Sequence, residues 1–115
     1  MRVRSLRTGS KVLGKDEVYV GRRCAGHDGS VLGNMFVIGR EGTRDEVIAK
    51  YRAWLWTQVK NGNGEVLREL GMLSESATLC CWCADLNERD THEGKLVCHA
   101  QVIARCVRWL RGKVA

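Results

Sequence analysis

The sequence predicts a small α/β protein, a single-domain layered sandwich with a mainly parallel sheet and about three helices. Two observations predict it. Strand-like and helical segments follow one another in the order β-β-(β)-α-α-β-α, and no internal repeat or linker interrupts them. The 115 residues match the usual size of one domain, so residues 1–115 are expected to share one core.

The strands are predicted from short apolar or alternating runs. Residues 3–6 alternate, and residues 17–20 form a second run that Gly21 stops. A third, weaker candidate is the apolar stretch 35–38. Residues 77–83 form a compact apolar run that is typical of a buried strand.

The clearest helix is predicted to begin at Thr43, because Thr43 and Glu46 have the spacing of a capping box. An apolar stripe at helical spacing follows: Val47, Ile48, Tyr51, Trp54 and Leu55. The Asn-Gly-Asn-Gly sequence at 61–64 is expected to break this helix.

Two further helices are expected after that break. A short one carries Val66, Leu67 and Leu70 and is predicted to end at Gly71. The last begins at Cys98, and its apolar face comprises Val102, Ile103, Cys106, Val107 and Leu110.

Composition limits the class of protein. Apolar residues make up 44% and charged residues 28%, which is typical of a folded chain. No apolar run is long enough to span a bilayer, and no apolar stretch follows the basic N-terminus as in a signal peptide. We therefore expect a cytoplasmic protein without a membrane partner, in which six cysteines indicate metal binding, catalysis or burial rather than disulfides.

The net charge of +6 lies in the first half of the chain. Residues 1–60 contain 12 Lys and Arg against 6 Asp and Glu, whereas residues 61–115 contain 7 of each. Such a basic half favours an anionic partner, either a small phosphorylated or nucleotide-like molecule or a nucleic acid. A solubilising surface is the simpler interpretation of the same charge.

The cysteines cluster at the predicted carboxyl end of the 77–83 strand. Alternation along a strand places Cys81 and Cys83 on one face, and Cys80 and Trp82 on the other, toward the core. Ligands of open α/β sheets usually bind at this edge. The pair at 98–99, Cys-His, would begin the last helix, where the helix dipole favours a thiolate or a bound anion.

These segments resemble the uncharacterised bacterial and phage family known as domain of unknown function 4326. The resemblance covers most of the chain. It is carried by Val18-Tyr19-Val20-Gly21-Arg22, Gly33-Asn34-Met35-Phe36, the 42–52 helix start, Leu79-Cys80-Cys81-Trp82-Cys83 and Cys98-His99.

The chain departs from the family pattern at three points. Met35 replaces the family's proline, and the proline expected after the Cys-Trp-Cys motif is missing, with a longer loop that carries His92. Ala100 and Gln101 stand where the family has Gly-Asp. If that pair helps to hold a ligand, the activity is lost or altered here. The resemblance implies an architecture and a site but no reaction.

Several functions remain open for this site. The favoured one is a phosphorylated or nucleotide-like ligand held by Arg22, Asn34, Cys83, Cys98 and His99, although Asn34 is also a typical turn residue. A second is a zinc-stabilised module that binds nucleic acid or protein, with ligands Cys81, Cys83, Cys98 and His99, or His92 in place of His99. A third is a thiol-dependent enzyme whose candidate catalytic residues are Cys98 and His99. The cysteines are also consistent with simple buried hydrophobic residues.

Overall fold

The computed structural model describes residues 1–7, 12–23, 28–82, 89–90 and 96–113. Within these residues the strands form one sheet in the order β2-β3-β1-β4. Both β1 and β2 pair parallel with the central β3, and β4 pairs antiparallel with β1. The prediction of a mainly parallel sheet is therefore confirmed. The strands are β1 (Arg2–Ser5), β2 (Glu17–Tyr19), β3 (Thr78–Cys81) and β4 (Arg89–Asp90).

The candidate strand at 35–38 was wrong. This stretch forms only an isolated bridge between Ile38 and Gly42. Gly39 and Gly42 have φ angles of 92° and 139°, and the Gly39 N–H donates to the Gly42 carbonyl at 2.8 Å. Glycines in this conformation turn the chain instead of extending it. The two-residue β4 was not predicted.

Helix α1 (Arg44–Lys60) begins as its capping box predicts. The Thr43 hydroxyl accepts from the Glu46 N–H at 3.3 Å, and the Glu46 carboxylate accepts from the Thr43 N–H at 3.1 Å. Each side chain thus satisfies one backbone donor of the helix start. The helix ends at the Asn61 C-cap, before Gly62 with its φ of 73°.

Helix α2 (Gly64–Met72) follows after a single turn. The Asn63 side chain caps it by accepting from the N–H groups of Glu65 and Val66. The prediction that Gly71 ends this helix was wrong, because the helix continues to Met72. Gly71 does not adopt positive φ, and the buried Leu73 beyond it holds the last turn against the core.

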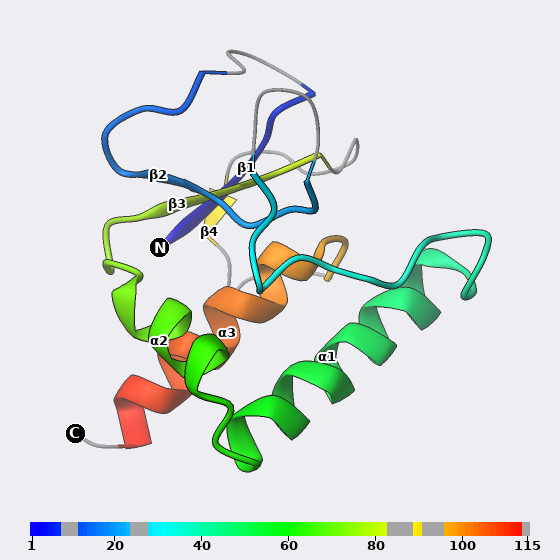
Figure 1. Cartoon of the computed structure of the whole chain (residues 1–115). Helices are drawn as coiled ribbons and strands as arrows, with labels where there is room; N and C mark the ends of the chain where they lie inside the picture. Colours follow the sequence, from blue (N-terminus) through cyan, green and yellow to red (C-terminus); the bar gives the residue numbers. More distant parts are fainter. Residues whose placement is uncertain (8–11, 24–27, 83–88, 91–95, 114–115) are drawn as a thin grey trace.

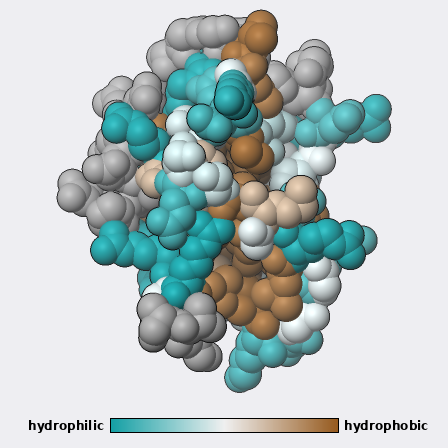
Figure 2. All heavy atoms as spheres, turned by 90° about the vertical axis from the view of Figure 1, so that its left-hand side faces the viewer, coloured by the Kyte–Doolittle hydropathy of each residue, from teal (hydrophilic) through white to brown (hydrophobic). Residues whose placement is uncertain are grey.

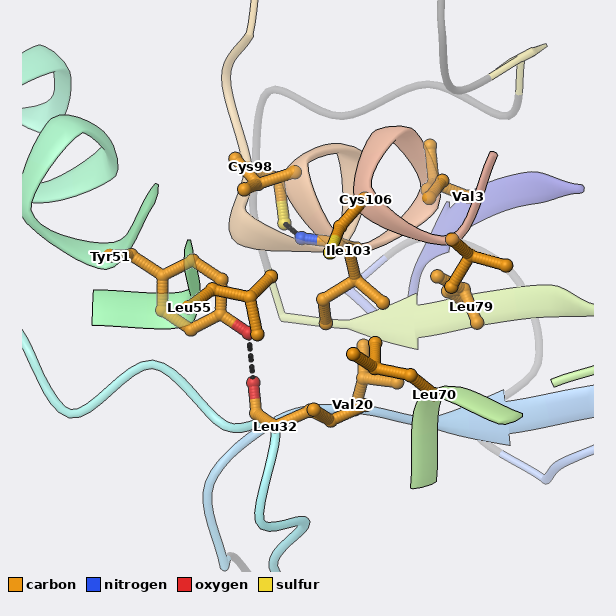
Figure 3. Close-up of a cluster of buried hydrophobic side chains, with 14 of the residues drawn as sticks. Val3, Val20, Leu32, Tyr51, Leu55, Leu70, Leu79, Cys98, Ile103 and Cys106 are labelled. Carbon is orange, nitrogen blue, oxygen red and sulfur yellow. Dashed lines mark hydrogen bonds between the residues drawn. The ribbon is translucent and has the colours of Figure 1, made fainter. Parts of the chain in front are cut away.

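The molecule has two layers, with the three helices gathered on one side of the sheet (Figure 1). Helix α3 (His99–Lys113) contacts β1 and β3 directly, and α1 and α2 pack against α3. The predicted apolar faces of α1 and α3 supply a large share of the core, although Trp54 and Leu110 are only partly buried. Figure 3 shows this core between the sheet and α3, including Val3, Leu79, Ile103 and Cys106.

The surface carries some exposed apolar side chains. Figure 2 shows them as a band between hydrophilic residues on the face at the left of Figure 1. Over the described residues, Val12 and Met72 are the most exposed large apolar side chains, at 78% and 71%. In the same part of the chain no helix has the length and hydropathy that crossing a membrane requires.

Candidate functional site

A cavity of about 460 Å³ opens where the parallel strands end. Segments that are far apart in the sequence meet there, because parallel strands bring their carboxyl ends to one edge of a sheet. The starts of α1 and α3 close it. Its lining includes Arg7 after β1, Gly21 and Arg22 after β2, Cys81 and Trp82 at the end of β3, Arg44 on α1, and Cys98 and His99 at the start of α3.

The start of α3 is capped by its own side chains. The fully buried Gln101 accepts from the N–H groups of Val97 at 2.7 Å and Cys98 at 3.1 Å. The Cys98 sulfur lies 3.5 Å from the Ala100 N–H, in the position of an N-cap acceptor. The arrangement is similar to a capping box, but a thiol replaces the usual hydroxyl and accepts from the second N–H of the helix, not the third.

This role of Gln101 was not predicted from the sequence, in which Ala100 and Gln101 only stand where the family has Gly-Asp. The signal was the spacing Cys-x-x-Gln, which equals the Ser/Thr-x-x-Glu/Gln pattern of a capping box. Gln101 binds the backbone and does not line the cavity.

Two sulfurs and one imidazole meet at the inner wall of the cavity. The Sγ atoms of Cys81 and Cys98 are 3.0 Å apart, although 17 residues separate them in the chain. The His99 Nδ1 lies 3.7 Å from the Cys98 Sγ, and its Nε2 lies 2.8 Å from the Val20 carbonyl oxygen. A carbonyl only accepts, so Nε2 carries the hydrogen, and the lone pair of the neutral ring is on Nδ1, toward Cys98.

The position of His99 is fixed from several sides. Its ring is buried and meets the ring of Tyr51 edge-on, with centroids 5.1 Å apart. Tyr51 is itself buried and donates from its hydroxyl to the Leu32 carbonyl at 2.6 Å (Figure 3). Burial raises the pKa of Tyr51 well above its ordinary value, so this residue stays a neutral donor. Helix α1, the 28–34 loop and α3 are therefore tied together behind the cavity.

The prediction that Cys80 and Trp82 both face the core is correct only for Cys80. Cys80 is fully buried, as predicted. Trp82 was predicted to lie in the core, but it is half-buried and lines the cavity. The reason is that β3 ends at Cys81, so strand alternation no longer directs the next side chain. Cys83 lies outside the described residues, as does His92.

Gly21 and Gly33, which belong to two of the family motifs, lie close together at the cavity rim. A Cβ on Gly33 would lie 3.0 Å from the Gly21 carbonyl oxygen, which also accepts from the Ser30 N–H. A Cβ on Gly21 would lie 2.5 Å from the hydroxyl oxygen of Tyr19. That hydroxyl donates to the Arg22 carbonyl. Glycine at these positions lets the two loops pack closely at the cavity rim.

Asn34 serves the loop and also lines the cavity. Its side-chain oxygen accepts from the Phe36 N–H at 2.9 Å, which makes a local turn. The interpretation of Asn34 as a turn residue is confirmed. Its contact with a ligand stays a prediction.

Two groups of arginines in the basic half of the chain have different surroundings. Arg4 forms two hydrogen bonds with the Glu17 carboxylate, at 2.7 and 3.0 Å, outside the cavity. These bonds raise the pKa of Arg4, and together with the Gly14 N–H they lower that of Glu17. The second group is Arg7, Arg22, Arg23 and Arg44, which all line the cavity. No Asp or Glu is present in the part of the lining that the structure describes.

The zinc site of the sequence analysis stays a prediction. In the described ranges no group of three His, Cys, Asp or Glu side chains could hold a metal ion. The Cys81 and Cys98 sulfurs are also closer than the roughly 3.8 Å expected for two thiolates on one tetrahedral zinc. Of the predicted ligands, Cys83 and the alternative His92 belong to the residues that are not described.

The comparison with protein families agrees with the motifs that meet at the cavity. The family model described as "Domain of unknown function (DUF4326)" matches residues 3–109. No curated protein and no solved structure matches the chain. The match spans β2, β3 and β4 and most of β1 and α3, so the chain belongs to the DUF4326 family.

Proposed function

We propose that the cavity binds a small anionic ligand that is phosphorylated or nucleotide-like. The observation that carries this proposal is the convergence of four arginines, Arg7, Arg22, Arg23 and Arg44, on a described lining without a carboxylate. Guanidinium groups bind phosphate oxygens in pairs and keep their charge at any ordinary pH.

The size and chemistry of the cavity support the same conclusion. Its volume of about 460 Å³ lies within the range of roughly 300–1,000 Å³ that is typical of small-molecule sites. The lining also contains the aromatic side chains of Tyr19, Phe36 and Trp82. Rings of this kind stack on flat ligand groups such as nucleobases. The N-terminus of α3 adds the positive end of a helix dipole to the same wall.

Calorimetric titration tests the proposal with inorganic pyrophosphate and adenosine monophosphate at low ionic strength. We expect saturable binding of at least one of them. Arg22→Glu and Arg44→Glu should each weaken it by about tenfold or more, since each replaces an attraction by a repulsion. The matched control is Arg68→Glu, which makes the same charge change at an exposed position of α2 outside the cavity. It should leave the affinity within about twofold of the unchanged protein.

The relative affinities identify the part of the ligand that is recognised. Tighter binding of the mononucleotide than of pyrophosphate would indicate that the aromatic residues stack on the base. If neither probe binds, or if Arg68→Glu weakens binding as much as Arg22→Glu, the cavity is not an anion site.

Binding of a DNA duplex belongs in the same experiment, because nucleic acid would use the same arginines. Its affinity should fall steeply with salt if phosphate contacts dominate. Arg4 is expected to contribute little, because Glu17 already neutralises it. A duplex that binds more tightly than either small probe would favour the nucleic-acid interpretation.

A further inference from the structure

The thiol pair Cys81–Cys98 suggests a property that goes beyond ligand binding. Both residues carry reduced thiols, and both are buried at 1% exposure in the inner wall of the cavity. Their sulfurs are 3.0 Å apart, and a disulfide bond needs about 2.05 Å. A shift of about 1 Å would therefore join the end of β3 to the start of α3.

The two thiols differ in their surroundings. The Cys98 sulfur lies 3.7 Å from the His99 Nδ1, which can accept its proton when the ring is neutral, and it accepts from the Ala100 N–H at the helix start. Both groups favour a thiolate, which is the reactive form of cysteine. The Cys81 sulfur contacts Cys98 and, at 4.0 Å, the Arg4 carbonyl, an acceptor that does not stabilise negative charge.

We propose that Cys81 and Cys98 form a reversible disulfide when the protein meets a peroxide, with Cys98 as the attacking thiol and Cys81 as the resolving thiol. Cys98 gives its proton to His99 Nδ1, and its sulfur attacks one peroxide oxygen. The O–O bond breaks, the departing hydroxide takes the proton from His99 as water, and Cys98 becomes a sulfenic acid. The Cys81 sulfur then attacks the Cys98 sulfur. The S–S bond forms, the S–O bond breaks, and a second water leaves with the Cys81 proton.

The remaining described cysteines provide internal controls. Cys106 lies two turns along α3 in the core, and burial raises its pKa to about 11. Cys80 is fully buried; its thiol donates toward the Thr78 carbonyl and also interacts with the Arg4 guanidinium. Neither is expected to enter the disulfide, because the Cys81 and Cys98 sulfurs already lie 3.0 Å from each other.

The experiment treats the whole protein with hydrogen peroxide and maps its cysteines by mass spectrometry under non-reducing conditions. We expect a peptide that links Cys81 to Cys98 and disappears on treatment with a dithiol reductant. Cys80→Ser and Cys106→Ser should give the same linked peptide. In Cys81→Ser, a cyclic diketone should trap the sulfenic acid at Cys98, whereas Cys98→Ser should yield no trapped product at Cys81.

The mapping on the unchanged chain decides the proposal even if a variant fails to fold. A linkage of either residue to a different cysteine would overturn it. So would peroxide-treated protein in which Cys81 and Cys98 both remain thiols. Zinc present in stoichiometric amount that protects both thiols from peroxide would show that they are metal ligands and would also overturn it.

Discussion

Helices α1 and α3 both begin at the cavity, yet they are capped in opposite ways. At α1 the capping residues are Thr43 and Glu46, and Asp45 adds a second acidic group in the first turn. At α3 the cap is the neutral Gln101 with the Cys98 sulfur, and the first turn contains no acidic residue. Carboxylates in the first turn cancel the positive end of a helix dipole, whereas a neutral amide leaves it in place.

The contrast separates two uses of a helix start. The dipole of α1 is compensated within the fold, and this stabilises the helix itself. The dipole of α3 remains available to a thiolate at Cys98 or to an anion in the cavity. Both helix starts have backbone N–H groups that need acceptors. At α1 the acceptors are charged and stabilise the helix, whereas at α3 they are neutral and leave the positive potential of the helix start in place.

The largest effect on stability is expected from Gln101→Ala. It removes the acceptor for two backbone N–H groups, those of Val97 and Cys98, at a buried position. Each donor left unsatisfied costs about 1–3 kcal/mol, so the free energy of unfolding should fall by roughly 2–6 kcal/mol. Urea denaturation measures it. A loss below about 0.5 kcal/mol would mean that water replaces the amide and that the cap is not structural.

Gln101→Glu sharpens the comparison because it keeps the acceptor and adds a charge. This variant makes α3 resemble α1. It should retain most of the stability that Gln101→Ala loses, because the carboxylate still accepts from the same N–H groups. Affinity for pyrophosphate should fall about tenfold, or about 1.4 kcal/mol, because the new charge cancels the helix dipole beside the cavity. Unchanged affinity in titration calorimetry would show that the potential of α3 plays no part in binding.

At α1, Thr43→Ala is expected to cost about 1 kcal/mol of unfolding free energy, since it removes one side-chain acceptor at an exposed helix start. Thr43→Ser retains a hydroxyl and should restore most of the loss. Neither change should alter anion affinity, because Thr43 does not line the cavity. If Thr43→Ala weakened pyrophosphate binding as much as Gln101→Glu, the two helix starts would not have separate roles.

The smallest effect concerns pH. Hydrogen bonds from the backbone and side chain of Thr43 hold the pKa of Glu46 below its ordinary value. A carboxyl whose pKa is lower in the folded than in the unfolded state stabilises the fold above its ordinary pKa of about 4.3. This contribution is lost as pH falls through the lowered value. The melting temperature of Glu46→Gln should therefore decline less than that of the unchanged protein from about pH 5 to pH 3. Parallel declines in the two proteins would contradict this linkage.

Local signals predicted the parts of the fold that depend on local physics. The Thr43–Glu46 capping box and the apolar stripes of α1 and α3 were confirmed, because caps and helical periodicity are decided within a few residues. The end of α2 was predicted less well. Packing of Leu73 overrode the tendency of Gly71 to stop the helix.

The candidate site was predictable as a place but not in its contacts. Sheet topology brings the ends of β2 and β3 to the start of α3, and the motifs alone indicated this edge. The pairing of Cys81 with Cys98 could not be read from spacing, since it depends on how α3 docks against β3. Strand alternation had instead grouped Cys81 with Cys83. Likewise, no local pattern shows that Glu17 neutralises Arg4 while other arginines face a cavity.

The contact between Cys81 and Cys98 also bears on how this family can vary. Strand β3 ends at Cys81, and Cys98 directly precedes α3. The segment between them, which includes β4, therefore starts and finishes where the two sulfurs lie 3.0 Å apart. Doubling the length of such a closed segment costs only about 0.6 kcal/mol of additional closure entropy. Insertions in this segment are therefore expected to cost little while both sulfurs keep their places, so natural selection can vary its length at a small energetic cost.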